Sequence, residues 1–152
     1  LAPRWHFIGA IQRNKVRSLA PLVHLWHGVA RASEGAEIAR WSPGAAVLVQ
    51  VNVSGEATKN GVPPDEAAAL VVRLRELDLD VRGLMGIAAQ GSTDAARGEF
   101  RMLADLARHL ELAELSMGMS EDLEVAVQEG ATMIRVGRAL FGPRPSRSGL
   151  RE

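Results

Sequence analysis

Short apolar runs with strand character recur along this chain, and a helix-like stretch follows each of them. The most informative run is Ala45 to Val53, because both of its alternating faces are apolar until polar residues appear near its end. A strand covered on both faces in a parallel sheet shows this pattern, whereas a half-exposed hairpin strand alternates throughout. The six expected strands are Trp5 to Ile8, Val23 to Trp26, Ala45 to Val53, Val81 to Ile87, Leu112 to Met117 and Thr132 to Val136.

Helix signals fall between these runs. The clearest follows Pro63 and Pro64, where an acidic pair precedes apolar residues that share one helical face. A second segment, from about Thr93 to Leu110, also keeps apolar residues at helical spacing. The other expected helices are a short one with Ser120 as its N-cap and Gly130 as its stop, one within Gln12 to Leu22, and one within Val29 to Trp41, where Gly35 weakens the pattern.

Strand-and-helix units in succession indicate an α/β fold with a parallel sheet. Periodicity alone does not separate an open sheet from a barrel. The strand pattern at Trp5 to Ile8 begins within a few residues of Leu1, so we expect the natural chain to begin further upstream. Because the sequence contains no domain linker, we expect one domain over residues 1–142. Residues 143–152, with two prolines and three arginines, are expected to be a tail.

Composition excludes several classes of function. The chain has 18 basic and 18 acidic residues, so it lacks the positive charge that marks a binder of nucleic acid or of an acidic membrane. No apolar run approaches the roughly 20 residues of a membrane span, and no secretion leader opens the chain. A cytoplasmic protein is therefore expected. Without cysteine, the chain has no disulfide framework, no thiolate metal site and no cysteine nucleophile.

Small and polar residues follow the apolar runs, at the strand ends where parallel α/β folds bind their ligands. Ser116 and Ser120 lie in a turn that leads into an expected helix, and Arg135, Gly137 and Arg138 follow the next strand. Hydroxyls, backbone N–H groups and a helix dipole would converge there on an anion such as phosphate.

The same residues have plainer interpretations. Ser120 alone can be a helix cap, Gly137 a close-packing glycine and Arg135 a structural ion pair, and the turn is neither a Walker loop nor a dinucleotide fingerprint. Core packing is expected for Trp5 and His6. The remaining candidates are expected to be structural or on the surface: His24 and His27 lack zinc spacing, and Lys15 and Lys59 are the only two lysines.

Five ordered sequence blocks, spanning residues 5–142, resemble the YggS/PROSC family of pyridoxal 5'-phosphate homeostasis proteins. They are Trp5-His6-Phe7-Ile8-Gly9 with Gln12, Asn14 and Lys15; Gln50-Val51-Asn52 with Glu56, Lys59 and Gly61; Gly83-Leu84-Met85; Leu115-Ser116-Met117-Gly118-Met119-Ser120 with Asp122; and Arg135-Val136-Gly137 with Phe141-Gly142. Such an ordered set of blocks is very specific.

The resemblance implies a (β/α)8 TIM barrel of the alanine racemase N-terminal type, here lacking about its first two β/α units, with pyridoxal 5'-phosphate at its C-terminal face. It implies that Arg135 faces the pyridine nitrogen, where its fixed charge disfavours ring protonation and weakens the ring as an electron sink. The other implied cofactor contacts are Ser116 or Ser120 and the backbone of Gly137 and Arg138 for the phosphate, and Asn14 and Met85 for the ring.

Three positions depart from the family pattern. The family's Schiff-base lysine lies upstream of the Trp5 block and is absent from this chain, so covalent attachment of the cofactor is in doubt. Arg138 stands where the family usually has threonine, which removes a hydroxyl and adds charge beside the expected phosphate. Gly28 follows His27 where the family has serine, and Ala30 replaces its aspartate, so polar contacts from that strand are lost.

The resemblance implies a non-catalytic carrier that stores pyridoxal 5'-phosphate or delivers it to apo-enzymes. One alternative is a racemase-like enzyme that uses Lys15, Lys59 or an upstream lysine as its amine. The chain has no tyrosine to act as the opposing base of such a racemase. The other alternative is a phosphate-binding barrel fragment for an unrelated sugar phosphate.

Overall fold

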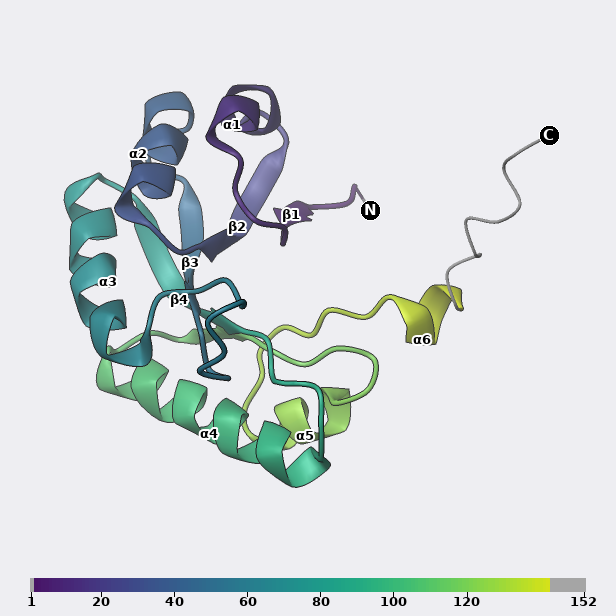
Figure 1. Ribbon diagram of the computed structural model, residues 1–152. Coiled ribbons are helices and arrows are strands. Elements are labelled where there is room, and N and C mark those ends of the chain that lie inside the picture. Colours follow the sequence, from purple (N-terminus) through teal and green to yellow (C-terminus); the bar gives the residue numbers. More distant parts are fainter. Residues whose placement is uncertain (1, 143–152) are drawn as a thin grey trace.

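The computed structural model describes residues 2–142, which form a curled parallel sheet with helices on its outer side (Figure 1). The expected tail at residues 143–152 lies outside the described residues. The sheet has five strands in sequence order: β1 (Trp5–Phe7), β2 (Val23–Val29), β3 (Ala46–Val51), β4 (Asp80–Gly86) and β5 (Glu114–Ser116). All four pairings between neighbouring strands are parallel, as predicted.

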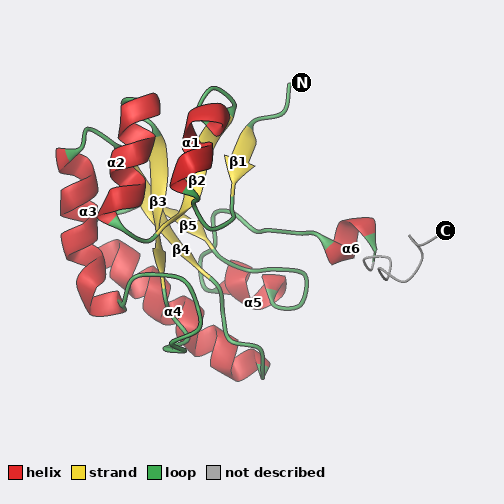
Figure 2. Cartoon of the chain, turned by 45° about the horizontal axis from the view of Figure 1, so that its top comes forward, coloured by secondary structure: helices red, strands yellow, loops and turns green. Residues whose placement is uncertain are grey.

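A helix follows each strand, and Figure 2 shows α1 to α4 along one face of the sheet. The helices are α1 (Arg13–Leu19), α2 (Ala32–Trp41), α3 (Ala67–Glu76) after the 3₁₀ turn η1 (Pro64–Glu66), α4 (Thr93–His109), α5 (Leu123–Gln128) and α6 (Arg138–Phe141). Within residues 2–142, no helix combines the length and the apolar character needed to cross a membrane.

The two faces of the sheet have different cores because side chains alternate along each strand. The outer face carries Trp26, Val47 and Leu84, which belong to the large cluster that the sheet forms with the helices. The concave face carries a smaller cluster of four buried residues, Leu25, Ala46, Leu48 and Met85. The concave face therefore has a much smaller apolar core than the outer face, and its polar residues gather toward the carboxyl ends of the strands.

Helix α2 forms despite the glycine that weakens its pattern. A Cβ atom on Gly35 would lie 2.1 Å from Leu74 Cδ2, so the glycine lets α2 approach α3 closely. Gly35 and Leu74 are both buried. This contact between neighbouring helices explains a residue that local propensity disfavours.

Two expected local features are wrong. The expected sixth strand is reduced to a single bridge between Ser116 and Met133. The chain still follows β5 past this bridge, since the Arg135 N–H donates to the Gly118 carbonyl oxygen at 2.9 Å, but Gly118 has φ +92° and is not part of a regular strand. Ser120 is not the N-cap of α5, since that position belongs to Asp122, which accepts a hydrogen bond from the Met119 N–H at 2.6 Å. The expected stop after α5 is confirmed, with Gly130 at φ +98°.

Candidate functional site

A cavity of about 1140 Å³ opens at the carboxyl ends of the strands, where the sequence predicted the ligand site. His6 and His27, from β1 and β2, form part of its wall. Most of the rest comes from three segments that follow β4 and β5: residues 87–93, 119–122 and 133–138, with Phe141 and Gly142 at the end of α6. Segments far apart in the sequence therefore meet at this cavity.

Arg135 is the most firmly held polar side chain of the cavity wall. Its Nη1 donates to Ser116 Oγ at 2.8 Å, and its Nη2 donates to the Gly86 carbonyl oxygen at 2.8 Å. Burial lowers the pKa of Arg135, and the nearby Asp122 carboxylate opposes this effect. Arginine has five N–H donors, so the guanidinium retains N–H groups for a ligand after these two bonds.

Ser116 and two histidines continue the polar contacts behind Arg135. Ser116 is fully buried, and its Oγ lies 2.8 Å from His27 Nδ1. The other ring nitrogen of His27, Nε2, lies 3.0 Å from Nδ1 of the exposed His6. An unbroken row of hydrogen-bonding groups thus runs from Arg135 to the protein surface.

The electrostatics of this row favour neutral imidazoles. Burial, followed by the positive charges of His6 and Arg135, lowers the pKa of His27 to about 4. The pKa of His6 is also lowered, by burial first and by His24 and Arg4 next, with Glu114 acting in the opposite direction. The fixed charge of Arg135 is therefore the main positive charge of this row at neutral pH.

Three of the expected phosphate contacts lie on the cavity wall: Ser120, Gly137 and Arg138. Ser120 Oγ accepts a hydrogen bond from the Ala139 N–H at 3.1 Å, which ties the turn after β5 to the start of α6. The exposed Arg138 guanidinium pairs with Glu121. Ser116, the alternative serine, does not line the cavity and lies behind Arg135.

The two expected ring contacts do not meet the cavity. Asn14 is an exposed residue in the first turn of α1, and Met85 is fully buried in the concave-face cluster with Leu25, Ala46 and Leu48. Neither belongs to the cavity wall.

The sequence interpretation missed three parts of this wall: His6, His27 and residues 87–93. Core packing was expected for His6 and Trp5, but both residues are exposed, and Trp5 retains 63% of its accessible surface. The predicted second strand ends at Trp26, whereas β2 continues to Val29 and carries His27 on its concave face. In a strand that continues past Trp26, His27 lies on the same face as Leu25, because every second residue of a strand shares a face.

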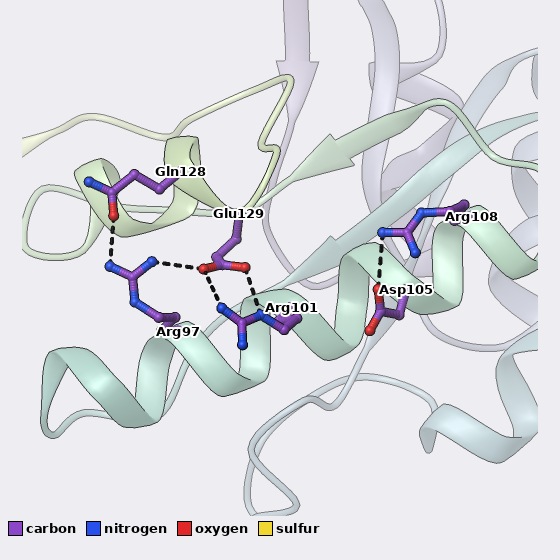
Figure 3. A network of polar contacts seen from close by, with 6 residues as sticks. All are labelled: Arg97, Arg101, Asp105, Arg108, Gln128 and Glu129. Atoms are coloured by element: carbon purple, nitrogen blue, oxygen red, sulfur yellow. Dashed lines mark hydrogen bonds and ion pairs between the residues drawn. The ribbon is translucent and has the colours of Figure 1, made fainter.

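Polar contacts also hold the elements beneath the site together (Figure 3). Glu129, directly after α5, accepts hydrogen bonds from Arg97 at 2.7 Å and from Arg101 at 3.1 Å, both on α4. Arg97 also donates to the side-chain oxygen of Gln128. Because α5 follows the turn that contains Ser120, this network holds the turn against the body of the fold.

The potential metal ligands do not gather into a site. Among residues 2–142, no group of three or more histidine, aspartate or glutamate side chains is placed to hold a metal ion. His6, His24 and His27 approach one another as stacked or hydrogen-bonded rings.

Comparisons with known proteins agree with this geometry. Residues 3–145 match the family described as alanine racemase, N-terminal domain. The pyridoxal phosphate homeostasis protein of Pseudomonas aeruginosa is 44% identical over 150 residues, which cover 92% of this chain and 64% of that protein. Its namesake in Deinococcus radiodurans is 45% identical, over 90% of this chain and 66% of that protein. The chain thus spans slightly less than two thirds of the length of these curated relatives.

Solved structures show the same fold. PipY of Synechococcus elongatus, solved with PLP bound, superposes with a TM-score of 0.79 at 32% identity, over 91% of this chain and 70% of that chain. Alanine racemase of Clostridium difficile superposes with a TM-score of 0.75 at 16% identity, over 97% of this chain and 41% of that one, which shows a shared fold alone. The expected fold type is confirmed. The chain belongs to the alanine racemase N-terminal domain family and, within it, to the pyridoxal phosphate homeostasis proteins.

Proposed function

We propose that this chain supplies the ring-facing and phosphate-facing wall of a pyridoxal 5'-phosphate site, in a protein that serves pyridoxal phosphate homeostasis. The names of the relatives and the PLP-bound PipY structure support this proposal. The observation that carries it is Arg135, whose guanidinium is fixed on the cavity wall by Ser116 and Gly86 and keeps N–H donors free. A pyridine nitrogen without a proton is a suitable acceptor for such a donor.

The residues present fit the cofactor. The cavity exceeds the roughly 300–1,000 Å³ of typical small-molecule sites, so the ring and the phosphate have room. The Ser120 hydroxyl would donate a hydrogen bond to the phosphate, and the backbone at Gly137 and Arg138 would supply the other phosphate contacts. The Arg138 side chain adds a positive charge where a threonine is usual. We propose no direct contact for Ser116, and the roles of Asn14 and Met85 stay predictions.

We further propose that the protein is a carrier and not an enzyme. The cofactor supplies an electron sink to catalysts when its ring nitrogen is protonated. Arg135 keeps a fixed positive charge at that position and has no acceptor atom, so it disfavours the protonated ring. We propose apo-enzymes as the recipients. A carrier has to share their compartment, which favours the cytoplasm as its place of action.

Binding without covalent attachment tests the proposal. The probe is 4'-deoxypyridoxine 5'-phosphate, which keeps the ring and the phosphate but lacks the aldehyde, and it is titrated beside pyridoxal 5'-phosphate itself. We expect saturable binding of both. Borohydride reduction and peptide mass mapping then show whether Lys15 or Lys59 is labelled. Failure of both ligands to bind contradicts the proposal.

Two control measurements separate the alternatives. Racemisation of alanine above the rate of free cofactor in buffer would replace the carrier with an enzyme. Displacement of the deoxypyridoxine probe by a simple sugar phosphate at equal concentration would show that the site recognises only a phosphate, and would favour the barrel-fragment alternative.

A further inference from the structure

We propose that His27 is a positioning residue, which fixes the guanidinium of Arg135 by accepting a hydrogen bond from the Ser116 hydroxyl. This inference rests on the proposed function for its ligand, but its contacts are those of the protein alone. His27 is 2% exposed, and its Nδ1 lies 2.8 Å from Ser116 Oγ. Its side chain is an almost fully buried part of the cavity wall, and Ser116 lies between it and Arg135.

The direction of each hydrogen bond follows from arginine chemistry. Arg135 can only donate, so Ser116 Oγ accepts from its Nη1. The Ser116 hydroxyl has one proton of its own, and His27 Nδ1 is its other hydrogen-bond partner. Every group in the buried cluster is satisfied when Ser116 donates that proton to an unprotonated Nδ1, because a buried hydroxyl without an acceptor is costly.

The same argument determines the outer end of the row. With Nδ1 unprotonated, the neutral ring of His27 carries its proton on Nε2, which then donates to His6 Nδ1 at 3.0 Å. All bonds run in one direction, from Arg135 through Ser116 and His27 to His6. The lone pair that Ser116 presents to Arg135 is thus held in place by His27, and the remaining N–H groups of Arg135 keep one orientation toward the cavity.

Two amide variants separate this role from simple space filling. In His27→Asn the side-chain oxygen takes the place of Nδ1 and still accepts from Ser116, whereas in His27→Gln the amide reaches the place of Nε2 and faces His6. We expect His27→Asn to bind 4'-deoxypyridoxine 5'-phosphate like the unaltered chain. We expect His27→Gln to bind it about threefold to tenfold more weakly, the usual effect of losing one hydrogen bond. Inorganic phosphate should bind all three proteins equally.

A third variant tests whether His27 acts through Ser116. Ser116→Ala should weaken the binding of the probe as much as His27→Gln does. The double variant should bind the probe no more weakly than either single variant. Additive losses, or equal affinities of the Asn and Gln variants, would overturn the proposal.

Nuclear magnetic resonance of the ligand-free chain keeps the proposal independent of the proposed function. Long-range ¹H–¹⁵N spectra should show His27 protonated on Nε2 and bare on Nδ1. The guanidinium N–H signals of Arg135 should be resolved in the unaltered chain and in His27→Asn, and averaged by rotation in His27→Gln. A proton on Nδ1, or unchanged arginine signals in all variants, rejects the positioning role. If the probe binds none of these proteins, the proposed function fails, and these spectra still decide the role of His27.

Discussion

Arg135 donates from Nη2 to the carbonyl oxygen of Gly86 at 2.8 Å, across 49 positions of sequence. Gly86 is the last residue of β4, and Arg135 follows the bridge beside β5. The bond therefore closes one side of the cavity by joining the ends of two neighbouring parts of the sheet. A charge-assisted bond of this kind is stronger than a bond between neutral groups, so it holds the arginine against the backbone.

Substitution of Arg135 by lysine should weaken the binding of 4'-deoxypyridoxine 5'-phosphate about tenfold or more, because lysine keeps the charge but loses the planar fork that bonds Ser116 and Gly86 together. Isothermal titration calorimetry measures the affinity. Arg108→Lys, on an exposed arginine of α4 paired with Asp105, is the control and should bind like the unaltered chain. Equal affinities for both variants would contradict a specific role for Arg135.

The free energy of unfolding should fall as the pH drops from about 6.5 to about 4. The pKa of His27 is about 4 in the folded state against 6.5 ordinarily, so the unfolded chain binds a proton in this range that the folded chain does not. The slope approaches about 1.4 kcal/mol per pH unit for one proton. Urea unfolding at several pH values measures it. In His27→Asn the slope between these pH values should be smaller, and an unchanged slope would assign it to other groups.

A second loss of stability should occur at lower pH, from Glu129. Hydrogen bonds from Arg101 and then Arg97 lower the pKa of this carboxyl from its ordinary 4.5 (Figure 3). The ionised form is the stabilised one, so its contribution is full above pH 4.5 and is lost as the pH falls through the lowered pKa. Glu129→Gln should flatten the acid limb of the unfolding midpoint. Glu124→Gln, on an exposed residue of α5, should leave that limb unchanged.

Two glycine-to-alanine substitutions should have opposite effects on stability. Gly61 has φ +126°, and a Cβ atom there would lie 2.5 Å from the backbone nitrogen of Asn52, so Gly61→Ala should destabilise the fold by about 2 kcal/mol or more. Gly98 is exposed on α4, and a methyl group added there would have nothing within 4 Å, so Gly98→Ala should stabilise by about 0.5–1 kcal/mol. Chemical denaturation measures both, and effects of the same sign would contradict the steric argument.

Local patterning predicted most of the architecture. The run from Ala45 to Val53 is apolar on both faces because β3 lies between a helix layer and the concave cluster, and the structure places a fully buried strand at Ala46–Val51. The helix at Thr93–His109 was predictable for a similar reason, since Phe100, Leu103 and Ala107 occupy its buried face. Such periodic burial can be predicted from consecutive residues alone, without knowledge of the distant residues that pack against them.

Features that depend on a distant segment were not predictable in this way. The run from Thr132 to Val136 has strand character, but only Met133 forms a β-bridge, to Ser116, and the partner segment leaves the extended conformation at Gly118, which has φ +92°. Gly35 opposed a helix by local propensity, and only the close approach of Leu74 on α3 explains its place in α2. Tertiary packing overrides propensity at both positions.

The sequence by itself determined the order of the strands and helices, the edge of the sheet that carries the site, and the arginine on its wall. Alternation and helical spacing set the order of the elements, and the direction of parallel strands sets the edge of the sheet that carries the site. Only the tertiary structure decided which groups surround Arg135. His6, His27 and Ser116 come from three different strands, and their ring and hydroxyl atoms meet because the sheet curls. Hydrogen bonds over 21 and 89 positions of sequence leave no local pattern, so the partners of the arginine follow from the fold alone.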